Sequence, residues 1–404
     1  MTGGRSLTIA ASLAAGVAGG AWLWRHQGEI ATRRPVNEWT FTHIDRVMPT
    51  EPVRCGGLTR PLPVAPNERL IANVRYEYEG SRTLADLHRR THTTGFLVLH
   101  RGRVLHESYP GAFASPQTWF QLFSLTKSVT SMLVGIAVRR GEIGSTADLV
   151  VSYLSELLDS GYDGVTVEQL LNMCSGVGGV EDWTVPDAPI NRFETAVTTG
   201  GSVLDVIRSM GRVHEPGIAF NYSTIDTQVL GWVLEAATGS SLAQYAERHL
   251  WQQMGAESDG YYFLTRGRPR TAIGGGSLNA TVRDLARIGS IMAGGGRLGE
   301  TEIVPAAWVE RSRGSELPYL QVGALLDGGG YAHYGYANQW WTLGGERRAF
   351  TGLGVHGQFL WVDPRSETVI VKTSAWNTPD DEERDRETCT ALAAIVLAVE
   401  AQAS

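Results

Sequence analysis

The stretch SLTKSVTSMLVGIAVRRG, residues 124–141, decides how the rest of this sequence is interpreted. Beyond Lys127 the apolar residues recur at helical spacing, and Gly141 supplies a stop signal, so a buried helix is expected here. Ser124 should stand at the entrance of that helix. Lys127 follows three residues later, one turn away on the same face.

A serine followed by a lysine at this spacing suits nucleophilic catalysis. A serine hydroxyl needs a base at neutral pH, and a buried lysine can lose its proton and serve as one. A four-residue match of this kind is expected by chance in 404 residues, and a surface lysine is the alternative. Only Lys127 and Lys372 are lysines, however, so 35 − 2 = 33 of the basic residues are arginines, which cannot act as bases.

The regions around this helix predict the fold class. Strand-like runs occur near both ends of the chain, and the segments between them have helical spacing. We therefore expect an α+β fold, in which N- and C-terminal segments form one antiparallel sheet flanked by helices, with a mostly helical insert. The expected strands are residues 95–100, 104–108, 358–362 and 368–373, and the expected helices include 223–237, 281–294, 305–312 and 388–401.

Composition excludes several functions. The net charge of -7 gives no reason to expect a nucleic-acid partner. Neither a P-loop nor an HExxH pair occurs, and the lack of a GxSxG elbow counts against an α/β-hydrolase. Acyl transfer by a serine needs no cofactor and no metal, and we expect none. The cysteines are too few for a disulfide scaffold, and we expect free thiols, with one disulfide as the alternative in an exported protein. They are Cys55, Cys174 and Cys389.

Residues 1–66 predict the domain organisation. Arg5 precedes an apolar run over residues 7–24, which predicts a signal peptide or membrane anchor within residues 1–30, with a buried helix as the alternative. Prolines then mark residues 31–66 as a linker or arm, and residues 67–404 form the main domain. A location in the cell envelope follows from the first of these expectations.

Longer motifs carry a family resemblance. Together with residues 124–127, the sequence resembles the serine β-lactamase and penicillin-recognising superfamily on its class C and esterase side, and most of all the nylon-oligomer (aminohexanoate-dimer) hydrolase group. The stretches that carry the resemblance are residues 170–176, 281–287, 339–341 and 352–364. The resemblance implies that Tyr222, in Phe220-Asn221-Tyr222-Ser223, is the catalytic tyrosine, which a lysine ammonium would help to ionise. Without it, a packed aromatic is the simpler interpretation of Tyr222.

The third motif of β-lactamases, Lys-Thr-Gly, has two candidate positions. Lys372-Thr373-Ser374 matches by letter, but the order of strands places the motif at Gly352-Leu353-Gly354. By that register the N–H groups of Ser124 and Val355 form the oxyanion hole, and Lys372 is structural. The motif's lysine is then missing, and Thr224 replaces an asparagine, which counts against binding of a β-lactam carboxylate.

The resemblance also implies a substrate site. Trp183 stands where the nylon-oligomer enzymes have a tyrosine, Gly274 where they have an asparagine, and Glu194 near their acidic residue for the substrate's amine. Trp340, Trp341 and His356 are further candidate pocket walls, although tryptophans are more often core residues.

These features predict acyl transfer on a small-molecule ester or amide. The rivals are a β-lactamase or D-alanyl-D-alanine carboxypeptidase, and a catalytically silent binding or sensor module. The natural substrate and the oligomeric state do not follow from the sequence.

Overall fold

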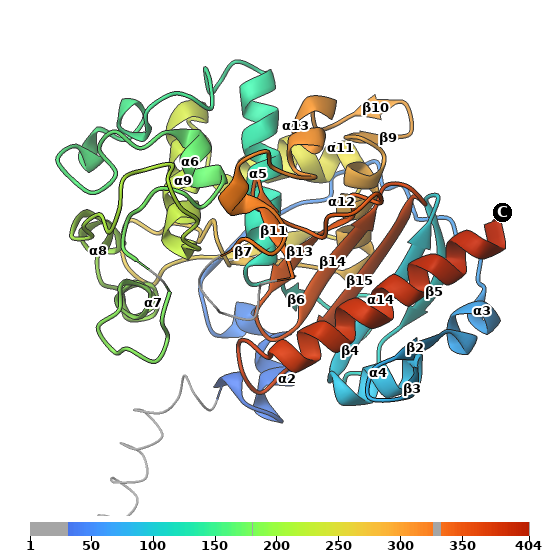
Figure 1. The fold of residues 1–404 in the computed structure, drawn as a ribbon. Helices are drawn as coiled ribbons and strands as arrows, with labels where there is room; N and C mark the ends of the chain where they lie inside the picture. The colour runs from blue at the N-terminus through green and yellow to red at the C-terminus, as the bar shows by residue number, and fades with distance from the viewer. Residues whose placement is uncertain (1–30, 180, 326–332, 404) are drawn as a thin grey trace, which may run out of the picture.

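The computed structural model describes residues 31–179, 181–325 and 333–403. Its centre is a seven-stranded antiparallel sheet (Figure 1). In spatial order the strands are β11 (Gly335–Ala337), β12 (Trp340–Thr342), β13 (Phe350–Gly354), β14 (Gln358–Asp363), β15 (Thr368–Ser374), β4 (Thr93–His100) and β5 (Arg103–Ser108). The C-terminal strands thus join the N-terminal pair through β15 and β4, as the sequence predicts.

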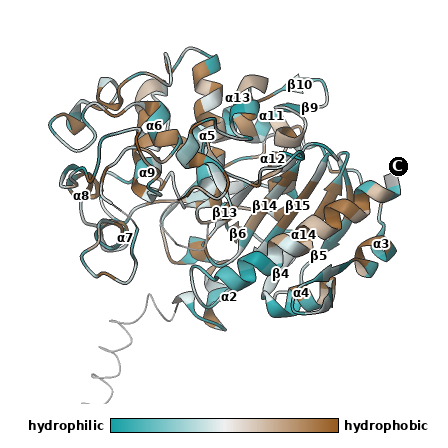
Figure 2. Ribbon diagram, in the orientation of Figure 1, coloured by the Kyte–Doolittle hydropathy of each residue, from teal (hydrophilic) through white to brown (hydrophobic). Residues whose placement is uncertain are grey.

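Alternation along the strands explains why both faces of this sheet are covered. Leu97 and Leu99 of β4 belong to one hydrophobic core, whereas Phe96 and Val98 belong to the other. Helix α12 (Val282–Ala293) packs on the first face, and α14 (Glu382–Ala403) crosses the second. Figure 2 shows that α14 begins with hydrophilic residues and becomes more hydrophobic further along. The helix starts six residues before the expected 388.

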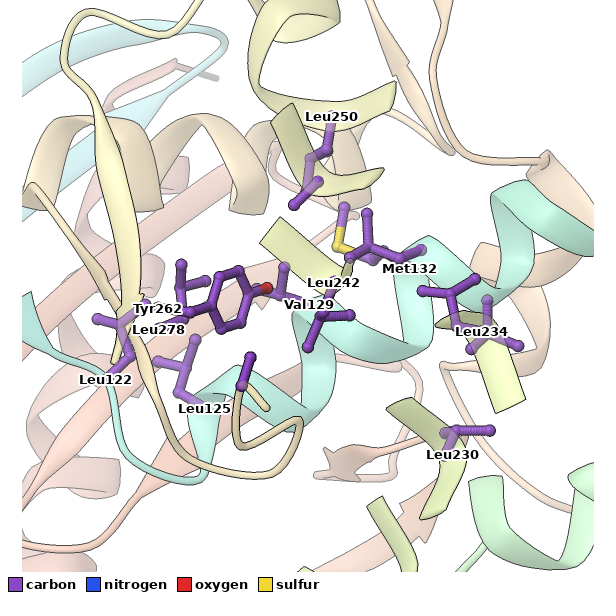
Figure 3. Packing of buried hydrophobic residues seen from close by; sticks show 14 of the residues in the cluster. Leu122, Leu125, Val129, Met132, Leu230, Leu234, Leu242, Leu250, Tyr262 and Leu278 are labelled. Carbon is purple, nitrogen blue, oxygen red and sulfur yellow. The ribbon is translucent and has the colours of Figure 1, made fainter. Parts of the chain in front are cut away.

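Helix α5 (Leu125–Arg139) lies between the sheet and the helical region. Residues 125–137 are all buried, polar side chains such as Lys127 included, so α5 is enclosed on every side rather than along one stripe. Figure 3 shows its side chains against those of α9 (Thr224–Thr238) and of the strands β7 (Gly260–Phe263) and β8 (Leu278–Ala280). Each large apolar side chain buried here contributes about 1.5–3 kcal/mol, so the N-terminus of α5 is firmly held.

The insert between α5 and β7 is mostly helical, as expected. Its helices are α6 (Val167–Leu171), α7 (Pro189–Thr199), α8 (Val203–Arg208), α9, α10 (Leu242–Ala246) and α11 (Gln252–Met254). Gln339 ties this region to the sheet, because its side chain accepts a hydrogen bond from Thr227 of α9 and donates one to the Leu170 carbonyl of α6.

Residues 31–66 form an arm that lies on the body. Strand β1 (Thr50–Val53) pairs with β7 in a second sheet of order β1-β7-β8-β6, where β6 is Phe120–Gln121. Short helices precede and follow it, α2 (Val36–Thr40) and α3 (Glu68–Asn73). Val53 and Leu62 are buried in the first core. The arm therefore contributes to the core.

The remaining strands and α-helices of the described residues are short and lie at the periphery. They are β2 (Arg75–Glu77), β3 (Ser81–Thr83), α4 (Leu84–Arg90), β9 (Arg297–Leu298), β10 (Thr301–Glu302) and α13 (Ala306–Arg311).

Two expectations concern the termini and the thiols. The apolar run 7–24 lies outside the described residues, and within the described ranges no helix is long and apolar enough to cross a membrane. Cys55, Cys174 and Cys389 are free thiols.

Candidate active site

Ser124 stands immediately before α5, in the position of its N-cap. A serine there usually accepts a hydrogen bond from the first turn, but the Ser124 side chain makes no capping bond. It instead accepts a hydrogen bond from Lys127 Nζ at 2.8 Å. Phe123, just before it, has φ +48°, a strained conformation for a large residue. The hydroxyl is thus turned toward the lysine and is half-exposed among buried neighbours.

Lys127 is buried and is surrounded by oxygen atoms. Besides Ser124, its ammonium donates to Thr224 Oγ1 at 3.0 Å and to the Gly275 carbonyl at 3.0 Å. Burial disfavours the charged form and lowers the pKa of Lys127 to about 8, although the carboxylate of Glu181 acts in the other direction. A lysine in this state supplies an appreciable fraction of neutral amine near neutral pH.

Tyr222 lies beside this pair, with its ring centroid 4.9 Å from Lys127 Nζ. Trp341 of β12 packs against the same ring at 5.4 Å. The pKa of Tyr222 is raised, chiefly by burial and then by the charge of Glu181, with the Ser124 hydroxyl as a hydrogen-bonding neighbour acting the other way. This differs from the expectation that the lysine would help the phenol to ionise, because desolvation dominates and Lys127 is not among the causes of the shift. Tyr222 is thus a neutral phenol that can donate a proton.

The turn after β13 lies against the segment that leads into Ser124. A Cβ on Gly354 would stand 2.3 Å from the Leu122 carbonyl oxygen, and one on Gly352 would stand 3.1 Å from the Leu125 and Ser128 side chains. Only glycine permits this approach. Among the described residues, neither the Ser124 N–H nor the Val355 N–H donates to a protein group. Both are therefore available to an oxyanion.

Glu181 is a site residue whose role the sequence does not reveal. Its carboxylate accepts two hydrogen bonds from Thr224, one from the backbone N–H and one from Oγ1 at 3.1 Å. Burial raises the pKa of Glu181, and Lys127 and Thr224 oppose that rise. The contact joins residues that are 43 positions apart in the chain, so no motif spacing predicts it. Gly275 leaves no signal in the sequence either, because it acts through its backbone carbonyl.

The predicted substrate residues divide into two groups. Trp341 contacts Tyr222, and Glu194 of α7 lies near enough to Glu181 for the two charges to repel. Glu194 is exposed by area, yet desolvation and then Glu181 raise its pKa to about 7. Trp183 lies in the loop after Glu181, with 36% of its surface exposed.

The other candidates lie behind the site. Gly274 is packed between α5 and α9, where Thr130 donates to its carbonyl and a Cβ would stand 2.8 Å from the Thr227 carbonyl oxygen. Trp340 points away from Trp341 into the first core, because neighbours on a strand face opposite sides. His356 is buried, and desolvation lowers its pKa to about 4. Its ring packs on Phe123 at 5.4 Å, which supports the segment before Ser124.

Lys372, which belongs to the alternative match to the third motif, lies on β15. Its side chain is in the core on the α14 face of the sheet. It is fully buried, bonds Ser374 Oγ and sits over the rings of Phe359 and Trp376, so its role is structural.

One side-chain group has the atom types of a metal site. His333, Asp385 and Cys389 bring one potential ligand atom each within 4.8 Å of one another. These groups already satisfy each other, since Asp385 bonds His333 and Tyr334, and Tyr334 bonds the Cys389 sulfur. None of them contacts Ser124 or Lys127.

An antiparallel sheet, a helix that begins at a serine, and a lysine one turn along it together define a serine hydrolase of the β-lactamase type. The β-lactamase family profile matches residues 81–395, and the chain belongs to that family.

Relatives and solved structures agree with this assignment. The chain is 33% identical over 358 residues to the 6-aminohexanoate-dimer hydrolase of Paenarthrobacter ureafaciens, covering 86% of this chain and 87% of the relative. It is 28% identical to esterase EstB of Burkholderia gladioli over 179 residues, 41% of this chain and 44% of the esterase. A solved Bacillus anthracis structure, assigned as a 6-aminohexanoate-dimer hydrolase, superposes with a TM-score of 0.80 at 24% identity, covering 90% of this chain and 95% of that chain.

Proposed function

We propose that this protein hydrolyses small carboxylic esters and amides through an acyl-enzyme on Ser124, with Lys127 as base and Tyr222 as proton donor. The observation that carries the proposal is the 2.8 Å contact between Ser124 Oγ and the Nζ of a buried lysine whose pKa is lowered to about 8. A base within hydrogen-bond reach of the nucleophile is the geometric requirement for this chemistry.

The steps follow from the placement of the groups. Neutral Lys127 takes the Ser124 proton as Oγ bonds to the substrate's carbonyl carbon, and the oxyanion lies between the N–H groups of Ser124 and Val355. Tyr222 gives its proton to the leaving group as the bond to that group breaks, and the Lys127 ammonium returns the proton to the phenolate. Water then attacks the acyl-enzyme, and its proton restores the Ser124 hydroxyl.

Charge favours substrates that carry an amine over those that carry a carboxylate. Glu181 and Glu194 repel each other, and Asp380 adds negative charge near Glu181 and Tyr222. Gly352 stands where β-lactamases have a lysine for the substrate carboxylate. The relative from Paenarthrobacter ureafaciens is named for the dimer of an amino acid, 6-aminohexanoate. We place such amides and uncharged esters first among the substrates of this protein, with Trp183, Glu194 and Trp341 as their contacts.

A substrate panel tests the proposal. Wild type, Ser124→Ala and Ser128→Ala are compared on a short nitrophenyl ester, the aminohexanoate dimer and a chromogenic cephalosporin. Ser128 is the matched control, since it is a serine of the same helix that bonds the Gln339 carbonyl instead of Lys127. We expect turnover of the ester or the dimer by wild type and Ser128→Ala, and loss of about 10³-fold or more in Ser124→Ala.

Two outcomes would overturn it. An active-site phosphonate that leaves no adduct on Ser124 by mass spectrometry would support a silent binding module. Turnover of the cephalosporin well above that of both other substrates would support a β-lactamase, despite the missing lysine.

We also propose that the protein works in the cell envelope, attached or exported through residues 7–24. Arg5 before this apolar run supports the assignment. Fractionation of cells with N-terminal sequencing of the mature chain tests it, and a full-length chain in the cytosolic fraction would contradict it.

A further inference from the structure

Thr224 stands between Glu181 and Lys127, and its hydroxyl makes one bond with each. Oγ1 gives its single proton to Glu181 Oε2 at 3.1 Å and accepts a hydrogen bond from Lys127 Nζ at 3.0 Å. The backbone N–H of Thr224 donates to the other oxygen of the same carboxylate. A carboxylate only accepts, so the direction of this chain of hydrogen bonds is fixed.

This direction determines where a neutral Lys127 can accept a proton. The Gly275 carbonyl can only accept, and the Thr224 hydroxyl, having given its proton to Glu181, can also only accept. Two of the three tetrahedral positions on Nζ must therefore carry hydrogens. The third faces Ser124 Oγ at 2.8 Å, so the lone pair of the neutral amine points at the serine proton.

We propose that Glu181 is a positioning residue, which through Thr224 orients the lone pair of Lys127 toward Ser124. This inference rests on the proposed function, in which Lys127 is the base. With glutamine at position 181, the single amide oxygen accepts from the backbone N–H of Thr224, and the NH2 group faces Oγ1. The Thr224 hydroxyl then has no acceptor at position 181, and it is free to rotate and donate to Lys127. The lone pair is then occupied by Thr224, and a hydrogen of the amine faces Ser124 instead.

Glu181 also controls how readily Lys127 loses its proton. Its charge opposes the fall in the pKa of Lys127 and contributes to the raised pKa of Tyr222. The charged groups that face Glu181 are Lys127 from α5, Glu194 from α7, Asp226 from α9 and Asp380 before α14. Lys127 is the only cation in this set, and removal of the Glu181 charge should lower its pKa further.

The test compares Glu181→Gln with Asp187→Asn, measuring kcat and KM for the nitrophenyl ester across pH. Asp187 is the matched control, because it is an exposed carboxylate six residues further along the same loop. We expect Glu181→Gln to lose about ten- to a hundredfold in kcat with little change in KM, as for other groups that orient a catalytic residue. The acidic limb of its pH profile should move to lower pH. Asp187→Asn should keep the wild-type kcat and the wild-type pH profile.

A second pair of variants keeps the inference testable if Glu181→Gln folds poorly. Thr224→Val removes the hydroxyl at nearly constant volume, and Thr224→Ser restores it. We expect Thr224→Val to lose kcat to a similar degree, Thr224→Ser to recover most of it, and Glu181→Gln to add little once Thr224→Val is present.

The positioning role of Glu181 and the hydrolase function of Ser124 can be disproved separately. Wild-type kcat and an unmoved pH profile in Glu181→Gln, beside an inactive Ser124→Ala, would overturn the positioning role and leave the hydrolase intact. An active Ser124→Ala would overturn the proposed function itself.

Discussion

Lys127 donates to three oxygen atoms as an ammonium, and only after it loses a proton can it accept one from Ser124. With the pKa lowered to about 8, the neutral fraction grows as the pH rises toward that value. We expect kcat/KM for a nitrophenyl ester to rise about tenfold per pH unit below about 8 and then to level off. Stopped-flow or plate assays between pH 5.5 and pH 9.5, in conditions where the fold is retained, measure this directly.

Substitution of Lys127 by arginine distinguishes a role as a base from a role as a positive charge alone. Lys127→Arg keeps the charge but cannot deprotonate, so its kcat/KM should fall by about 10²-fold or more at every pH. A wild-type profile in Lys127→Arg, or a flat wild-type profile between pH 6 and pH 9, would show that Lys127 acts only through its charge.

Tyr222 is expected to act as a neutral acid, and this role has a kinetic signature. Nitrophenolate leaves without a proton, but an alkoxide or an amine does not, so Tyr222→Phe should slow an alkyl ester or amide about 10²-fold more than a nitrophenyl ester. Tyr336→Phe is the matched control, because its buried hydroxyl has no partner among the described residues and its ring lies 6.3 Å from that of Tyr222. Equal losses on both substrates in Tyr222→Phe would identify it as the base instead.

For single residues, the sequence identifies side chains that lie close together because of their spacing in a motif. It does not identify side chains that are brought together only by the tertiary fold. Ser124 and Lys127 are one helical turn apart, so their contact follows from local geometry. Glu181 reaches Thr224 from a loop, and the Gly275 carbonyl reaches Lys127 from a turn. Neither contact leaves a pattern in the sequence, because loop geometry and backbone acceptors are set by tertiary packing.

Among the elements, β13 is the one whose sequence the site constrains most closely. A Cβ on Gly354 would stand 2.3 Å from the Leu122 carbonyl oxygen, a backbone atom that cannot swing away. We expect Gly354→Ala to displace the turn that carries Val355 relative to Ser124. Displacements of about 1 Å can cost about a hundredfold in rate, so kcat should fall strongly while far-UV circular dichroism stays unchanged.

The control for this substitution is Gly314→Ala, since nothing lies within 4 Å of a Cβ there and its φ is not positive. The kcat of Gly314→Ala should equal that of wild type. If Gly354→Ala also matches wild type, the turn after β13 does not hold an oxyanion.

Periodicity predicts the elements well, although it cannot tell which face of a strand meets the site. The strands expected at 358–362 and 368–373 are confirmed at Gln358–Asp363 and Thr368–Ser374, and the helix expected at 281–294 at Val282–Ala293. Trp340 and Trp341 are indistinguishable by composition, yet only Trp341 reaches Tyr222. One of the stretches that carry the family resemblance, residues 281–287, is structural. Thr281 caps α12 by accepting a hydrogen bond from the Asp284 N–H, and the Asp284 carboxylate pairs with buried Arg287.

On the scale of the whole molecule, the arm of residues 31–66 is the part whose contribution to stability is hardest to predict from the sequence. Its prolines indicate a linker, but Val53 and Leu62 fill the core and Phe41 packs against both Phe123 and His356. Burial of three such side chains contributes about 5 kcal/mol, comparable to the whole net stability of many domains. Removing β1 would also leave β7 as an exposed sheet edge.

We therefore expect a chain that starts at Asn67 to unfold at a markedly lower temperature than one that starts at Ala31, or to aggregate. Activity should fall with it, because Phe41 supports Phe123, the residue before Ser124. Thermal melts followed by circular dichroism, with ester turnover measured at 20 °C below each midpoint, separate the two effects. The chain from Ala31 retains the whole arm and controls for the loss of residues 1–30. Equal melting temperatures and equal turnover in the two chains would mean that the arm is an appendage, and that residues 67–404 fold and work alone.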